Sequence, residues 1–241
     1  MNGRSKKNIK AIFKKQLLLY LRNFMWIAPL IFIVMTAGFE LFVVEENEAG
    51  NMLSMFGSMM VSMSIMQIAL GFTTMDKASK NLKYMSMAGV KPFEYLTGTI
   101  SALGIGAVVF VTLFSLNAFI IGQNFFLIFG LLILGAFVSI FAGVTIGLLK
   151  GGLWGTIISM VLGFSIFFSG INDTIDNALF WLYPRQIDLI IRRYILANPE
   201  IMYPREVRIV DITTGFYVIL LNLAVIFVIF LWSNRKNRLE N

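Results

Sequence analysis

Six long runs of apolar residues dominate this sequence, and each is close to the length that an α-helix needs to cross a membrane. A helix rises about 1.5 Å per residue, so it crosses a roughly 30 Å hydrocarbon layer in about 20 residues. We therefore predict an all-α integral membrane protein with six transmembrane helices. The expected spans are residues 24–44, 52–74, 99–121, 125–148, 153–171 and 212–232.

The fourth and fifth spans are separated only by Lys150, Gly151 and Gly152. As a single helix, residues 125–171 would be about twice as long as the membrane is thick. The lysine and the two glycines are therefore expected to form a turn between two spans.

The composition excludes several classes of protein. The chain has 241 residues, 58% of them hydrophobic and only 14% charged, so six spans leave no room for a large soluble domain. It has no Cys and no His, which removes disulfides, thiolate and imidazole metal ligands, and nucleophiles that depend on an imidazole base. We expect no enzyme and no cofactor in this chain.

The net charge of +7 indicates membrane orientation better than nucleic-acid binding. If both termini are cytoplasmic, 15 of the 20 Lys and Arg residues lie on the inner side, as the positive-inside rule requires. We therefore expect a multi-pass protein of the cell membrane, with no nucleic-acid partner and with a basic cytoplasmic tail at residues 233–241.

The first 23 residues form a basic segment with helical periodicity. Ile9, Ile12, Phe13 and Tyr20 share one helical face, and Lys7, Lys10 and Lys14 share the opposite face. This pattern predicts a cytoplasmic interfacial helix with its basic side toward anionic membrane lipid. The alternative is a basic stretch that only orients the chain. No cleavable signal peptide is evident, so the first span is expected to be retained.

The cytoplasmic loop at residues 75–98 is longer than a tight turn requires. The residues that predict a short amphipathic helix here are Leu82, Met85 and Met87, with intervening Lys80, Lys83 and Tyr84. Gly89 is a plausible end of that helix, and Pro92 suits the first turn of the next one. A short helix outside the membrane offers a contact for another protein, and the alternative is a solvated connector.

This loop resembles the signature loop of ABC-2 type transporter permeases. The similarity covers about 25 positions: an acidic residue, Asp76, then a basic and leucine-containing stretch, then AGVKPFEYLTG from Ala88 to Gly98. In that family the acid is usually Glu. The layout is also similar, with an amino-terminal interfacial helix, six spans and a long external segment between the fifth and sixth spans.

The resemblance implies the transmembrane subunit of an ATP-driven exporter. The short helix would be a coupling helix that contacts a separate ABC ATPase subunit, and a second copy or a related permease would complete the pathway. ATP and magnesium would bind the partner, since this chain has no G-x-x-x-x-G-K-[ST] phosphate loop. The ATPase-coupling residues would be Asp76, Lys80, Leu82, Lys83, Gly89 and Glu94.

The external segment at residues 172–211 contains a second amphipathic pattern. Apolar residues recur at helical spacing from Ile187 to Ile195, with Arg185, Asp188 and Arg192 on the other side. We predict an external amphipathic helix near the outer leaflet, and the resemblance to exporter permeases implies that it caps the pathway; the alternative is a surface loop on lipid. The expected cap residues are Trp181, Ile187, Ile191 and Tyr194.

A methionine stripe follows the second span. Met55, Met59, Met63 and Met66 advance by three or four residues beside a stripe of serines that includes Ser62. Flexible thioether side chains suit variable hydrophobic cargo, so these five residues are a candidate substrate path. The alternative is helix packing.

Three function classes remain. The first is export of a hydrophobic or amphipathic substrate, such as an antimicrobial or other peptide, a lipid or a drug. The second is an ATP-independent channel or immunity protein that passes or sequesters a membrane-active molecule. The third is a lipid-modifying enzyme using the acid pair Asp173 and Asp176, although acids at this spacing are more typical of a helix start. The sequence does not select the cargo.

Overall fold

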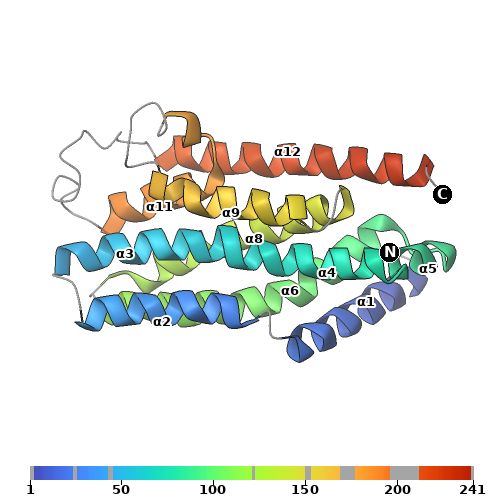
Figure 1. Cartoon of the computed structure of the whole chain (residues 1–241), viewed down its shortest axis with the longest axis horizontal. Helices are drawn as coiled ribbons and strands as arrows, with labels where there is room; N and C mark the ends of the chain where they lie inside the picture. Colours follow the sequence, from blue (N-terminus) through green and yellow to red (C-terminus); the bar gives the residue numbers. More distant parts are fainter. Residues whose placement is uncertain are drawn as a thin grey trace.

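The computed structural model describes residues 3–23, 26–42, 46–120, 123–149, 153–168, 177–195 and 212–239. These residues form helices and include no strand, which confirms the predicted all-α class. The helices lie side by side in an elongated bundle (Figure 1). Their bounds are α1 Gly3–Arg22, α2 Ile27–Phe42, α3 Glu46–Met59, η2 Met60–Ile65, α4 Met66–Ala78, α5 Asn81–Met87, α6 Pro92–Ser115, α7 Asn117–Ile120, α8 Phe125–Leu149, α9 Leu153–Phe168, α11 Tyr183–Ile195 and α12 Ile212–Leu239.

Among the described residues, four helical segments are long and apolar enough to cross a membrane. Length and composition thus indicate a multi-pass membrane protein. The four segments are Met52–Ala78, Pro92–Phe119, Phe125–Leu149 and Ile212–Trp232.

The first and fifth expected spans correspond to shorter helices. α2 and α9 have 16 residues each, fewer than one straight crossing needs. α1 and α2 pass the same criteria only as a pair bent by 56°, so length and composition support four or five spans. The sixth span stays a prediction, and the expected turn at residues 150–152 lies outside the described residues.

The continuous segment α3–η2–α4 is the central element of the bundle. Within Met52–Ala78, an apolar 18-residue stretch is 83% buried inside the protein, against 22% for the corresponding stretch of Ile212–Trp232. α8 approaches it closely through glycines: a Cβ at Gly143 would lie 2.5 Å from the carbonyl oxygen of Met66. A glycine there lets the two backbones come together, as is usual in membrane helix pairs.

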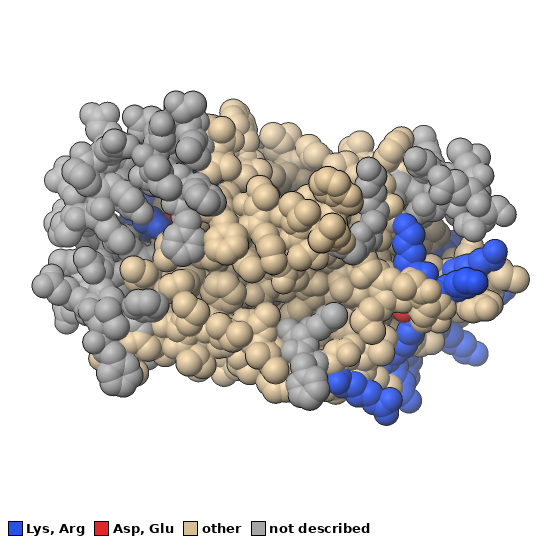
Figure 2. Space-filling model, in the orientation of Figure 1, with Lys and Arg blue, Asp and Glu red and all other residues tan. Residues whose placement is uncertain are grey.

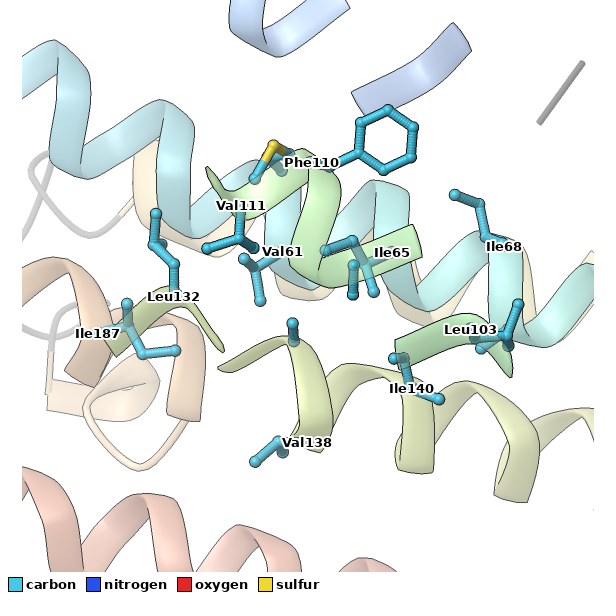
Figure 3. Close-up of a cluster of buried hydrophobic side chains, with 14 of the residues drawn as sticks. Val61, Ile65, Ile68, Leu103, Phe110, Val111, Leu132, Val138, Ile140 and Ile187 are labelled. Atoms are coloured by element: carbon cyan, nitrogen blue, oxygen red, sulfur yellow. The ribbon is translucent and has the colours of Figure 1, made fainter. Parts of the chain in front are cut away.

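Apolar side chains from several helices meet along this central segment. Figure 3 shows Val61 and Ile65 of η2 beside Val111 of α6 and Leu132 of α8. Ile187 of α11 lies at one side of the same cluster. The core therefore joins α6, α8 and α11 to the central segment.

Charged side chains gather at the end of the bundle formed by α1, α5 and the start of α6, which we call the basic end. On the face that Figure 2 shows, Lys and Arg residues lie there, and a broad surface without charged residues covers the middle of the bundle. This distribution matches a protein whose middle lies in lipid.

α1 packs lengthwise on α6, and whether its basic side faces membrane lipid stays a prediction. A Cβ at Gly98 would lie 2.8 Å from Ile12, and one at Gly106 would lie 2.6 Å from Tyr20. Both contact positions advance by eight residues, so the two helices run in the same direction. The apolar face of α1 thus covers protein, because small residues on α6 form a groove for it.

Candidate functional site

The loop predicted to carry a coupling helix contains the seven-residue helix α5. Lys80 before it and Gly89 after it have positive φ angles, +59° and +77°, so the chain turns sharply at both ends. Leu82 and Met85 pack against the bundle core. α5 thus has an inner side fixed on the protein.

The outer side of α5 is exposed. Tyr84 is 63% exposed and Met87 is 75% exposed, and the three-residue spacing puts them on one helical face. Lys80 and Lys83, two of the expected coupling residues, are also exposed. Leu82, which the same prediction included, lies on the inner side. The exposed surface thus combines two large apolar side chains with lysines.

Asp76 lies at the end of α4 and is 2% exposed. Its carboxylate forms an ion pair with Lys15 of α1 and accepts a hydrogen bond from Gln16 Nε2 at 2.6 Å. Asn81 Nδ2 of α5 and the Tyr95 hydroxyl of α6 also donate to it, at 3.3 and 3.1 Å. One buried carboxylate therefore links α1, α4, α5 and α6, and we call these five residues the Asp76 cluster.

Glu94 connects α1 to the start of α6. It accepts a 2.9 Å hydrogen bond from Asn8 Nδ2 and a 3.1 Å bond from the backbone N–H of Lys91, which caps α6. Arg4 donates to the Ala88 carbonyl oxygen at 3.1 Å. α1 thus holds both sides of the turn between α5 and α6.

The predicted substrate-path residues lie within the central helix. Met59 and Met66 are buried, and Met55 and Met63 are half-buried. Ser62 is buried and donates to the Ser58 carbonyl oxygen at 2.7 Å. These residues pack between helices, and whether any of them lines a route for cargo stays a prediction.

The central helix contains a feature that the sequence analysis missed. Residues Met60–Ile65 form the π-helical turn η2, which interrupts the α-helical spacing of the methionine stripe. Ser62 and Met63 lie inside this turn. π-Helical turns of this kind occur frequently at functional sites, but they leave no distinct signal in an apolar sequence.

The predicted cap helix is present as α11, but it is not on the surface. Pro184 through Arg192 are all buried, and α11 contacts α3, α8, α9 and α12. Ile187 and Ile191 are therefore core residues, whereas Trp181 is exposed. The helical spacing identified the helix but could not distinguish lipid from protein as the partner of its apolar face. The side chain of Tyr194 lies outside the described residues.

The polar side of α11 forms a buried ionic cluster. Asp188 accepts bonds from Arg185 Nη1 at 2.7 Å and from Arg192 Nε at 2.8 Å. The hydroxyl of Ser54 on α3 donates to the same carboxylate at 2.8 Å. We call these four residues the Asp188 cluster. In it, the buried carboxylate of Asp188 is paired with the two buried arginines of α11.

These arrangements define a class: a multi-pass helical membrane protein with a short exposed helix fixed at one end. No model of a protein family matches the sequence, and no curated protein matches it. Among the described residues, no group of three or more His, Cys, Asp or Glu side chains could hold a metal ion. Asp173 and Asp176 lie outside the described residues.

Proposed function

We propose that this chain is the permease subunit of an ATP-driven exporter of the ABC-2 type, with α5 as the contact for a separate ATPase subunit. The observation that carries the proposal is the division of α5 into two sides. Its inner side and its turns are fixed on the bundle, while Tyr84 and Met87 remain exposed. A helix that transmits movement between two proteins needs one side fixed on its own protein and another side free to bind the partner.

The Asp76 cluster supports a mechanical role for α5. A seven-residue helix is not stable alone, so its position depends on the contacts around it. Asn81 of α5 shares the Asp76 carboxylate with Lys15 of α1 and Tyr95 of α6. Displacement of α5 would therefore displace α1 and α6 as well. α6 begins at this end and continues through the apolar region, which provides a route from the partner to the spans.

The proposal also covers the partners, the topology and the cargo that the resemblance to ABC-2 permeases implies. The ATPase subunit would bind ATP and magnesium, and a second copy or a related permease would complete the pathway. Both termini and α5 would be cytoplasmic, with the protein in the cell membrane and six spans in total. The cargo would be hydrophobic or amphipathic: a peptide, a lipid or a drug.

The alternative of a protein that sequesters a membrane-active molecule receives less support. Such a protein would need α11 as an exposed amphipathic helix that binds the membrane-active molecule. The apolar residues Ile187, Ile190 and Ile191 are buried within the protein, so they offer no free surface to such a molecule.

Site-specific photocrosslinking in cells that natively contain the protein tests the proposal. A photoreactive amino acid at Tyr84 is expected to capture a protein with a nucleotide-binding phosphate loop, identified by mass spectrometry. The same probe at Val108, an exposed position in the apolar part of α6, provides the matched control and is expected to capture no ATPase.

Two results would contradict the proposal. Crosslinks from Tyr84 to lipid alone would assign α5 to the membrane surface. Equal capture of an ATPase from Tyr84 and Val108 would show that proximity in the membrane, rather than docking on α5, produces the crosslink.

A further inference from the structure

The exposed charges of the basic end are Lys and Arg side chains, because its two carboxylates are buried and bound to other side chains of the protein. In residues 3–23 and 75–100, the only acidic residues are Asp76 and Glu94, and both are buried. Asp76 pairs with Lys15, and Glu94 accepts from Asn8. Every other Lys and Arg in these two segments is exposed. Apart from a small patch of carboxylate visible among them, the described surface of this end therefore carries Lys and Arg side chains (Figure 2).

This positive field surrounds the two exposed apolar side chains of α5. Met87 follows Lys83 by four residues within α5, so these two side chains lie one helical turn apart on one face, and Lys80 lies at the turn just before the helix that carries Tyr84. All four side chains are exposed. Large exposed apolar side chains with a charged rim are typical of protein interaction sites.

We propose that α5 docks in a groove with an apolar floor for Tyr84 and Met87 and an acidic rim, made of Asp and Glu side chains, facing Lys80 and Lys83. This inference rests on the proposed function and adds the charge of the groove on the ATPase subunit. The basis is charge complementarity: the exposed charged residues of the described surface around α5 are Lys and Arg, so the partner must supply the anions.

An anionic membrane is the other partner that this charge could suit. A helix that lies on a membrane presents an apolar face along its length. On α5 that face, with Leu82 and Met85, is already packed on the bundle core. The exposed apolar side chains of α5 are only Tyr84 and Met87, with lysines nearby, and such a small apolar surface suits a protein groove better than a lipid surface.

The experiment measures affinity between the full chain in neutral-lipid nanodiscs and the ATPase subunit captured through Tyr84. Lys83→Glu is expected to weaken binding about tenfold, and Lys83→Gln less than that, because reversal adds repulsion to the lost attraction. Lys14→Glu is the matched control, since Lys14 is equally a lysine of the basic end but lies on α1. It is expected to change affinity less than twofold. Reversal of a groove carboxylate to Lys should restore binding of Lys83→Glu.

The outcomes separate this inference from the proposed function. If the ATPase binds wild type and Lys83→Glu with equal affinity, the acidic groove is wrong and the exporter proposal stands. If the ATPase does not bind wild type, both fail. If Lys83→Glu weakens binding only to phosphatidylglycerol vesicles, the acidic groove is likewise overturned, because the partner of these lysines is then the membrane.

Discussion

Asp76 joins four helices at the candidate site through its buried carboxylate. A buried carboxylate is costly unless its charge is paired and its lone pairs accept hydrogen bonds. Here one cation and three neutral donors satisfy it. The acid of the family-like motif therefore acts inside this chain, where a partner protein cannot reach it.

Replacement of Asp76 by Asn is expected to destabilise the protein by about 1 to 3 kcal/mol, because buried donors such as Gln16 and Tyr95 lose a charged acceptor, while the half-exposed Lys15 can turn to water. Thermal unfolding of the purified protein in detergent measures this loss. The exposed residue Lys10 provides a control, and Lys10→Gln should leave the transition within about 0.5 kcal/mol of wild type. An unchanged transition in Asp76→Asn would contradict the role of the cluster.

Gly89 carries a second residue-scale prediction. Its φ of +77° is a left-handed conformation, and a Cβ there would also lie 3.2 Å from Arg4 Nη2. Gly89→Ala is therefore expected to cost about 1 to 3 kcal/mol and to weaken ATPase binding, because the turn after α5 would shift. Gly104→Ala is the control in the neighbouring helix, since its nearest contact would be 4.0 Å away. Equal effects of the two changes would show that the turn conformation does not matter.

At the scale of elements, the close packing of α4 against α8 determines how the central helix is held. Gly143 and Gly147 of α8 lie against Met66 and Thr73 of α4. The two helices can approach this closely only because these positions lack side chains. The apolar composition of both helices would not by itself hold them together in lipid.

Gly143→Ala is expected to destabilise the protein by about 2 kcal/mol, because its Cβ would meet the backbone of Met66 at 2.5 Å and backbone atoms cannot move aside cheaply. Gly130→Ala in the same helix has no atom within 4 Å of its Cβ and should be neutral or slightly stabilising. Unfolding temperatures of the two variants in the same detergent compare them directly, and similar values would contradict the described α4–α8 contact.

Local sequence patterns predicted the elements better than they predicted the contacts between elements. The spacing of Leu82 and Met85 was sufficient to predict α5. The Asp76 cluster was not predictable, since Lys15 is about 60 residues away in sequence and nothing local indicates the pair. The turn η2 was missed because it has the same residue types as the α-helix around it.

At the scale of the whole molecule, the apolar runs predicted the helical membrane architecture. They could not predict where α11 packs. Periodicity describes one helix and does not say what covers it. In the structure, α11 enters the bundle and Ile187 contacts Gly135 of α8. This helix, which the sequence placed in an external segment, therefore forms part of the core.

The absence of cysteine allows a clean crosslinking experiment on α11. The double variant Gly135→Cys, Ile187→Cys is expected to form a disulfide on mild oxidation, because Ile187 Cγ1 lies 3.7 Å from a Cβ placed at Gly135, which brings the two positions near disulfide range. The control pair Gly130→Cys, Ile187→Cys should remain reduced, since a Cβ at Gly130 meets nothing within 4 Å. A disulfide in both pairs, or in neither, would place α11 elsewhere.

The proposed coupling role requires that α5 lies on the cytoplasmic side, where an ATPase can reach it. A single cysteine at Met87, which is 75% exposed, reports this directly when cells are treated with a membrane-impermeant maleimide. We predict no labelling in intact cells and full labelling in inside-out membrane vesicles. Labelling in intact cells would put α5 outside and contradict the proposed coupling role.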